Sequence, residues 1–281
     1  MRFTKMQGCG NDYVYVNCFE EKISNPEELA KKISDRHFGV GADGLILILP
    51  PVNKESDAFM QLYNFDGSKA SMCGNGIRCV AKYIYDHGII SKDRRETSID
   101  TPAGIKKISL EIQNQKVIAA TVNMEQAKIT SEIPEEIKIN DKKLKFIGVN
   151  VGNPHAVYFL EDNPEIKNIF SWPDSKFNLE GKNFENHLRF PDRVNSEFIE
   201  IISRDEIKMR VFERGSGETM ACGTGATAAA FAGFKAGKLN SKVLVHLRGG
   251  DLKIEIKNNS SCFMTGGAVE VFSGEIAIIC N

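Results

Sequence analysis

Hydrophobic and polar residues alternate with a period of two along most of the chain, a pattern that predicts β-strands. The expected strands cover residues 12–17, 45–49, 59–65, 105–112, 116–124, 149–160, 197–202, 207–214, 242–247 and 252–257. Asn114-Gln115 lies between two of these runs and predicts a hairpin turn. Helical patterns are fewer. One helix is expected to begin near Asn25-Pro26, with proline in its first turn, and to run towards Asp35.

Two further helices are expected directly after Cys73 and Cys222. The segment after Cys222 reads GTGATAAAFAGFKAG and has no charged residue before Lys235, as in a helix that is buried on all sides. The segment after Cys73, GNGIRCVAKYIYDHG, is apolar on most faces. Each segment ends at a glycine, Gly237 or Gly88, which is typical of a helix C-terminus. Each half of the chain is therefore expected to wrap a sheet around a central helix that carries a cysteine at its N-terminus.

The two cysteine segments match each other at a spacing of 149 residues, which indicates an internal duplication. At this spacing four pairs of residues are identical: Gly74 and Gly223, Gly76 and Gly225, Ala81 and Ala230, and Gly88 and Gly237. At a spacing of 142 residues, Gly10-Asn11 matches Gly152-Asn153. The repeat predicts an α+β fold of two domains related by a pseudo-twofold axis, with a boundary after residue 118 and a second domain over 119–267.

Composition and charge exclude several classes of protein. A chain of 281 residues has room for two domains, and its net charge of −1 offers no basic surface for nucleic acid. The longest nearly uncharged stretch, 219–234, is too short to span a membrane, and the N-terminal sequence MRFTKMQGCGND has no apolar signal segment. A cytoplasmic chain is expected, with a small-molecule substrate and neither a membrane nor a nucleic acid as partner.

The seven cysteines are irregularly spaced and include no C-x-x-C pair, so reduced thiols are expected rather than disulfides or a metal site. Cysteine is often buried, and core packing is the simplest interpretation of Cys18, Cys79, Cys262 and Cys280.

The positions of Cys73 and Cys222 suit acid–base chemistry. A helix N-terminus has unpaired N–H groups and partial positive charge, so it is expected to lower the pKa of a cysteine and to hold a carboxylate. Two such helix ends facing each other would place a thiol on either face of a carbon attached to a carboxylate. One thiolate could then remove a proton while the other thiol supplies one from the opposite side, which inverts the stereocentre without pyridoxal phosphate or any other cofactor.

Seven motifs, in this order along the chain, resemble those of the diaminopimelate epimerase family. They are GCGNDYVYV at 8–16, RHFGVGADG at 36–44, MCGNG at 72–76, GNPHAV at 152–157, RVN at 193–195, FERGSGET at 212–219 and ACGTGA at 221–226. The resemblance implies conversion of LL- to meso-2,6-diaminopimelate in lysine and peptidoglycan-precursor synthesis. It also implies two barrel-like sheets around central helices, with a C-terminal strand, 268–281, returning to the first domain, 1–118.

The resemblance also implies roles for particular residues. Cys73 and Cys222 match the acid–base pair, and His155 and Glu213 match residues that tune the pKa of the cysteines. The positions that match substrate-binding residues are Asn11, Asn64, Gly74, Asn75, Asn153, Asn195, Glu213, Arg214, Gly223 and Thr224. Some family members carry glutamine at the position of Gly44, so that contact must be absent here or made by backbone. Cys9 lies beside Asn11 and could be a third thiol near the site.

Other functions remain as alternatives. A proline or hydroxyproline racemase also uses paired cysteines, but the polar row of asparagines and Arg214 suits a longer substrate with a polar far end. A thiol–disulfide redox protein would not need two carboxylate-binding loops, and a binding protein without activity would not need both cysteines. The sequence leaves open which cysteine acts on which stereoisomer, how far the domains close, and whether the chain forms a homodimer.

Overall fold

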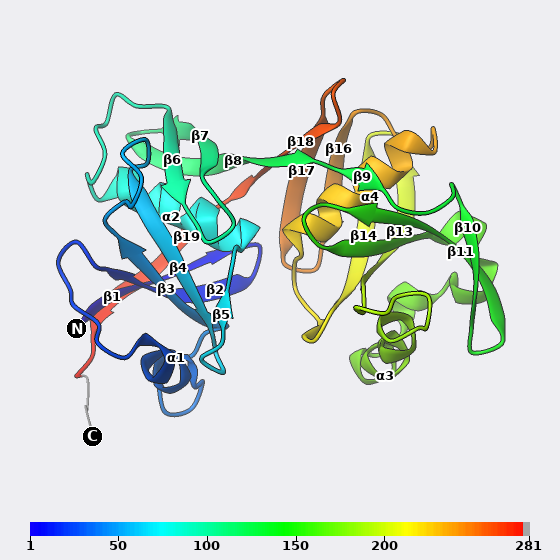
Figure 1. Cartoon of the computed structure of the whole chain (residues 1–281), viewed down its shortest axis with the longest axis horizontal. Coiled ribbons are helices and arrows are strands. Elements are labelled where there is room, and N and C mark those ends of the chain that lie inside the picture. The colour runs from blue at the N-terminus through cyan, green and yellow to red at the C-terminus, as the bar shows by residue number, and fades with distance from the viewer. Residues whose placement is uncertain (278–281) are drawn as a thin grey trace. The chain divides into compact units, whose positions relative to one another are not determined.

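The computed structural model consists of mixed β-sheet with few helices. It describes residues 1–277, and Cys280 and the end of the expected C-terminal strand lie outside this range. The α+β class is confirmed. The chain divides into two compact units, residues 1–122 with the chain from residue 266 onward, and residues 123–265. Strands β8 (Lys116–Gln126) and β18 (Ser261–Gly267) each run from one unit into the other (Figure 1). The boundary expected after residue 118 lies within β8.

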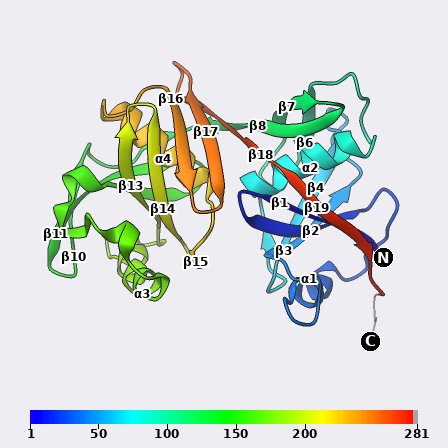
Figure 2. The same ribbon diagram turned by 180° about the vertical axis from the view of Figure 1, so that it is seen from behind.

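The first unit contains two helices and most of the N-terminal strands. The strands are β1 (Arg2–Gly8), β2 (Asn11–Asn17), β3 (Gly44–Leu49), β4 (Ala58–Asn64), β5 (Lys69–Ala70), β6 (Glu96–Asp100), β7 (Lys106–Gln113) and β19 (Val269–Glu275), and the helices are α1 (Pro26–Ser34) and α2 (Gly74–Asp86). β19 lies antiparallel against β1, and the backbones of Met1 and Ile276 are hydrogen-bonded to each other (Figure 2).

Helices α1 and α2 cover opposite faces of the strands β2 and β3. Successive side chains on a strand alternate between its faces, so neighbouring residues of these strands contact different helices. Val14 and Leu45 pack with the apolar side of α1, whereas Tyr15 and Ile46 lie on the α2 side. Both strands are buried on both faces, which explains why β3 reads as the unbroken apolar run GLILIL. In Figure 1 the strands of this unit surround α2.

The second unit repeats the strand order of the first. Its strands are β9 (Lys128–Ile129), β10 (Glu135–Ile139), β11 (Lys142–Asn150), β12 (Pro154–Phe159), β13 (Asn195–Ser203), β14 (Glu206–Glu213), β15 (Gly217–Glu218), β16 (Lys242–Leu247) and β17 (Gly250–Ile256). Its helices are α3 (Asp174–Glu185) and α4 (Gly223–Lys235), with three short 3₁₀ turns at Leu160–Asp162, Pro164–Ile166 and Ile169–Ser171.

The pairing types of the two units agree strand by strand. The antiparallel, parallel, antiparallel and parallel pairings along β1–β2–β3–β4–β6 recur along β11–β12–β13–β14–β16. In both units a helix connects the first two parallel strands, and the helix that follows a cysteine connects the second parallel pair. The duplication inferred from the sequence therefore extends to the topology.

Local turn chemistry explains several element boundaries. Asn25 caps α1 by accepting a hydrogen bond from the Glu28 N–H, and Asn114 and Gln115 both have positive φ, as a two-residue hairpin requires. The expected strand over 149–160 is wrong. β11 ends at Asn150, a turn with Gly152 at φ 91° follows, and β12 begins at Pro154. Among the strands longer than two residues, the sequence did not predict β1, β6, β10 or β18, and it did not predict α3. The C-terminal strand that the resemblance implied is present within the described residues as β19, antiparallel to β1.

Helix α3 covers the face of the second unit that lies opposite α4. Phe177 and Phe184 of this helix pack on Phe198 and Phe212 of the sheet in an aromatic core. Gly181 allows the close approach, because a Cβ at this position would lie 2.1 Å from the Phe212 ring.

A buried arginine, Arg210, joins α3 to the sheet. Its guanidinium donates to both carboxylate oxygens of Glu218 at 2.6 and 2.9 Å, to Asp174 at 3.1 Å and to two backbone carbonyls, and it lies over the Phe177 ring. Glu218 is nearly inaccessible to solvent.

We expect Arg210→Met to lower the free energy of unfolding by about 3–5 kcal/mol, because it leaves a buried carboxylate without its bidentate partner. Urea denaturation measures this loss. Arg248→Met is the matched control, since Arg248 also binds Glu218 but is largely exposed and should contribute less than about 1 kcal/mol. Equal losses in the two variants would contradict the assignment.

Candidate active site

Cys73 and Cys222 are the N-cap residues of α2 and α4, as expected. Each has an extended backbone, and each sulfur accepts a hydrogen bond from the N–H three residues later, Gly76 at 3.4 Å and Gly225 at 3.3 Å. Close packing favours glycine at both positions. A Cβ at Gly76 would lie 2.7 Å from the Ile46 side chain, and one at Gly225 would lie 2.8 Å from Glu197 Oε1.

Neutral groups surround the thiol of Cys73. The sulfur donates to Asn11 Oδ1 at 3.2 Å, and Asn75 donates to the same oxygen at 3.4 Å. The side chain of Tyr13 lies beside Cys73 and Asn11. Burial raises the pKa of Tyr13 well above its usual value, and the neighbouring Cys73 raises it further, so the phenol stays neutral.

A carboxylate behind Asn11 fixes the orientation of its amide. Asn11 Nδ2 donates to Asp43 Oδ2 at 2.8 Å, and Asp43 in turn accepts from Arg36 at 2.9 Å. An ionised carboxylate can only accept, so Asn11 must turn its nitrogen to Asp43 and its oxygen to Cys73.

We expect Asp43→Asn to reduce turnover on the order of 10-fold or more, because a hydrogen bond to a charged group contributes about 1.5–3 kcal/mol and holds Asn11 in place. Steady-state kinetics measure the effect. The control is Asp93→Asn, an exposed aspartate of the same unit that accepts from Ser91. A variant at Asp43 with the rate of the control would contradict this orienting role.

Acidic groups surround the thiol of Cys222. The carboxyl group of Glu213 lies near the thiol of Cys222 and accepts from the Thr219 hydroxyl, and Thr224 Oγ1 lies 3.4 Å from the sulfur. Burial raises the pKa of Cys222 well above its usual value, and Glu213 and Glu197 raise it further. The lowered pKa expected at this helix end is therefore wrong for Cys222, because burial and two carboxyl groups outweigh the helix N–H groups.

His155 lies between Glu197 and Asn153. Its Nδ1 is 2.7 Å from Glu197 Oε1, and its Nε2 is 2.8 Å from Asn153 Oδ1. Asn153 Nδ2 points to Thr224 Oγ1 at 3.4 Å. His155 is thus linked to the sulfur of Cys222 through the side chains of Asn153 and Thr224.

The other residues that are expected to bind substrate differ in burial and in the hydrogen bonds that they already make within the protein. Asn195 is buried, and its amide bridges the carbonyl of Pro154 and the N–H of Arg214. The guanidinium of Arg214 is exposed and donates to the carbonyl of Asp192 at 3.1 Å. Asn64 is half-buried and donates to Ser68.

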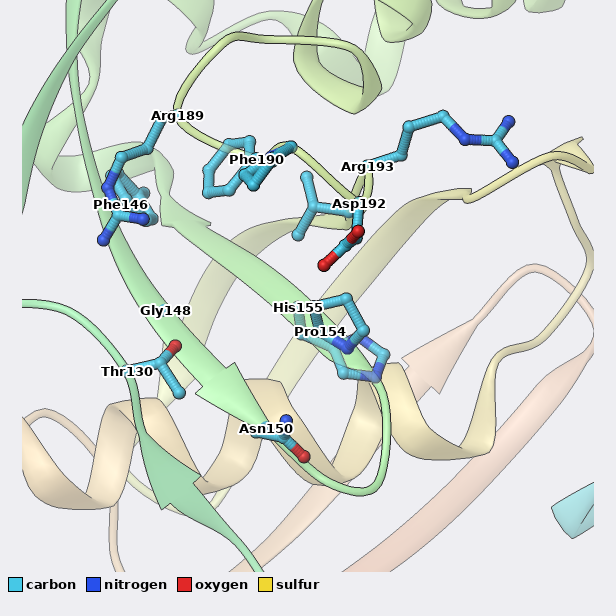
Figure 3. A pocket seen from close by; sticks show the side chains of 12 residues that line it. Thr130, Phe146, Gly148, Asn150, Pro154, His155, Arg189, Phe190, Asp192 and Arg193 are labelled. Carbon is cyan, nitrogen blue, oxygen red and sulfur yellow. The ribbon is translucent and has the colours of Figure 1, made fainter.

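A pocket of about 190 Å³ lies in the second unit beside His155. The loop from Arg189 to Arg193 forms one side, and Thr130 and Asn150 lie opposite (Figure 3). Asp192 points from this loop towards Pro154 and His155, whereas the Arg193 side chain points away. No cysteine lines the pocket, so it is not the centre of the expected chemistry.

Sequence reasoning missed Tyr13 and Glu197 as neighbours of the cysteines. The internal repeat carried a signal for Tyr13, because the spacing of 142 residues that matches Asn11 to Asn153 also matches Tyr13 to His155. Gly44 is closely packed, and a Cβ there would lie 2.2 Å from the carbonyl of Tyr63. Cys9 is buried with positive φ, and its sulfur lies 3.7 Å from the Arg78 guanidinium.

Within residues 1–277 no group of three or more histidine, cysteine, aspartate or glutamate side chains could hold a metal ion. No helix in this range is long and apolar enough to cross a membrane.

Comparison with known proteins identifies the family. A family model described as diaminopimelate epimerase matches residues 3–130 and 147–271. The chain belongs to the diaminopimelate epimerase family. Proteins of that name from Agathobacter rectalis and Acetivibrio thermocellus are 49% and 47% identical, over 99% and 98% of this chain and 100% and 98% of their own lengths. One from Methanococcus maripaludis is 45% identical over 99% of this chain and 100% of its own length.

Solved structures share the fold at low sequence identity. A probable proline racemase from Agrobacterium radiobacter has a TM-score of 0.74 at 13% identity, covering 99% of this chain and 93% of its own. A hydroxyproline epimerase from Agrobacterium vitis has a TM-score of 0.71 at 15% identity, covering 99% and 92%. At these identities the likeness shows the two-domain α+β fold alone.

Proposed function

We propose that this chain converts LL-2,6-diaminopimelate into meso-diaminopimelate without pyridoxal phosphate, with Cys73 and Cys222 as the acid–base pair. Membership of the family over nearly the whole chain supports the reaction. The observation that carries the mechanism is the repeated cysteine N-cap, in which each sulfur accepts from the backbone of a helix that is buried along most of its length.

In the proposed reaction one cysteine, as thiolate, removes the proton from the carbon next to the substrate carboxylate. The other cysteine, as thiol, transfers its own proton to the opposite face of the same carbon, and the carbon is thereby inverted. In the reverse direction the two roles exchange.

The helix N-termini are suited to hold the reacting carboxylate. The first N–H groups of a helix lack partners within it, and here they belong to Gly74-Asn75 and Gly223-Thr224. Hydrogen bonds from these groups would become stronger as negative charge moves onto the carboxylate during proton removal, which lowers the barrier. Their fixed geometry supplies the stabilisation that a cofactor ring would otherwise provide.

The two cysteines have different surroundings, acidic for Cys222 and neutral for Cys73. Burial and the neighbouring Glu213 and Glu197 raise the pKa of Cys222, so it rests as a thiol, with the carboxyl group of Glu213 nearby to accept its proton. Cys73 donates to the neutral amide oxygen of Asn11. We propose that Glu213 mediates the conversion of Cys222 between thiol and thiolate.

The far end of the substrate carries a second carboxylate and ammonium group. Arg214 presents an exposed guanidinium, which can hold a carboxylate through two parallel hydrogen bonds. Asn153 and Asn64 are half-buried and offer both a donor and an acceptor without adding charge. We assign the far end to these residues, with Asn195 acting on it by holding the backbone of Arg214.

The proposal also places the chain in lysine and peptidoglycan-precursor synthesis in the cytoplasm. We further propose that the chain assembles as a homodimer. Light scattering on the purified protein tests the homodimer.

The decisive assay gives the purified protein LL-diaminopimelate and L-proline in parallel, in the presence and absence of a chelator and with pyridoxal phosphate removed. Epimerisation of diaminopimelate alone, at an unchanged rate in all conditions, supports the proposal. Turnover of proline without turnover of diaminopimelate would contradict it in favour of a proline racemase.

A further inference from the structure

The proposed mechanism leaves one buried carboxylate without a role. Glu197 lies on β13 with its side chain fully inaccessible to solvent. Its Oε1 is 2.7 Å from His155 Nδ1, and within the described part of the chain its Oε2 has no hydrogen-bond partner. Burial of a carboxylate is costly unless a nearby positive charge compensates it, so this residue requires an explanation.

Glu197 lies directly against the first turn of α4. A Cβ at Gly225 would lie 2.8 Å from Glu197 Oε1 and 3.2 Å from the sulfur of Cys222. The carboxylate and the thiol are therefore on two sides of the same glycine.

The first unit shows that packing alone does not require a carboxylate there. Ile46 pairs with Tyr15 as Glu197 pairs with Val157, and it lies equally close to the first turn of α2. An aliphatic side chain supports the helix in the first unit. The charge of Glu197 is thus a feature specific to the Cys222 side.

The hydrogen bonds of His155 suggest what this charge does. Both ring nitrogens face oxygen acceptors, Glu197 Oε1 and Asn153 Oδ1. With Glu197 ionised and the oxygen of Asn153 facing the ring, both contacts are satisfied only if both nitrogens carry hydrogen. With its oxygen bound to the ring, Asn153 turns its amino group towards Thr224, whose hydroxyl neighbours the sulfur of Cys222.

We propose that Glu197 is a positioning residue for Cys222: it holds His155 as the doubly protonated imidazolium and so fixes the amide of Asn153. The two opposite charges compensate each other inside the protein. Removing one partner leaves an uncompensated buried charge, which is unfavourable. The effect on turnover rests on the proposed function, whereas the effect on His155 does not.

The titratable groups that face His155 come from four elements. They are Glu197 on β13, Glu213 on β14, Cys222 at the start of α4, and Asp192 on the loop beside the pocket. Of these four groups, Glu197 alone is hydrogen-bonded to the ring. Replacing it should therefore change the protonation of the ring even though Glu213 remains.

The test is ¹⁵N NMR of the imidazole nitrogens at pH 8, where a histidine with an ordinary pKa of about 6.5 is neutral. The chain has five histidines, and His155→Gln identifies the signals of His155. We expect both ring nitrogens to be protonated in the wild type and a neutral ring in Glu197→Gln. Glu200→Gln, an exposed glutamate on the same strand, should leave the spectrum unchanged. A neutral His155 in the wild type, or an unchanged ring in Glu197→Gln, would overturn the inference.

Kinetics provide the second measurement. Partners that orient a metal-bound histidine are typically worth 10–100-fold, and we expect a loss of kcat/KM of the same order in Glu197→Gln, with Glu197→Asp retaining more activity. Glu197→Ile, which copies the first unit, should fold but lose activity. Full turnover in Glu197→Gln with a neutral His155 would overturn the positioning role. A wild-type protein inactive on diaminopimelate would instead contradict the proposed function, and the NMR result would stand.

Discussion

Replacing Cys73 or Cys222 by alanine is expected to reduce epimerisation of diaminopimelate by at least 10²–10⁴-fold, the range that a positioned acid or base contributes. Each variant keeps one thiol, but inversion needs a group on either face of the carbon, so neither can complete the reaction. Serine should not restore activity, because a hydroxyl is a far weaker acid than a thiol. Coupled-assay rates of the purified variants measure the loss.

The control for the cysteine variants is Cys18→Ala. Cys18 is half-buried in the first unit and packs at the edge of the core beneath α1. This variant should retain the wild-type rate, and all three variants should unfold near the wild-type urea concentration. Activity within tenfold of wild type in either Cys73→Ala or Cys222→Ala would contradict the paired roles.

Arg214→Met is expected to lower kcat/KM for diaminopimelate by roughly 30-fold to several thousandfold. A carboxylate that loses its charged partner in a closed site loses on the order of 2–5 kcal/mol. Methionine keeps much of the length of the side chain but cannot donate, so the loss reports the ionic contact. Steady-state kinetics on LL- and meso-substrate measure it.

The matched control is Arg204→Met, an exposed arginine of the same unit that binds Asn240 and the carbonyl of Gly237. It should retain the wild-type kcat/KM. If Arg214→Met behaves as this control does, the far carboxylate binds elsewhere and the assigned orientation of the substrate is wrong.

The hairpin at Asn114-Gln115 and the helices after Cys73 and Cys222 could be predicted because short-range rules determine them, and the α+β class followed from the internal repeat. Helix α3 could not be found from periodicity, since Asp174–Glu185 has only a weak apolar stripe and is held by aromatic contacts with the sheet. The repeat offered a better signal. A helix connects the first parallel pair of strands in one half, so the matching connection in the other half should contain one too.

The helix-end positions of Cys73 and Cys222 could be predicted from their motifs, whereas contacts that depend on pairing across strands could not. Glu197 reads as one position of an alternating strand, and only the parallel pairing of β12 with β13 brings it to His155. The pKa of Cys222 was mispredicted for the same reason. The helix end is visible in the sequence, but the two carboxyl groups that outweigh it come from β13 and β14.

The isotope content of the first product molecules tests the two-cysteine mechanism most directly. Enzyme equilibrated in D₂O is mixed with LL-diaminopimelate, and early meso product and remaining substrate are analysed by mass spectrometry. The thiol that completes the inversion took its hydrogen from solvent before the substrate bound. We therefore expect deuterium at the inverted carbon of the product from the first turnovers, while recovered LL-substrate keeps its original hydrogen. Early product that carries mostly protium at that carbon would show one group moving the same proton across, and would contradict the roles of Cys73 and Cys222.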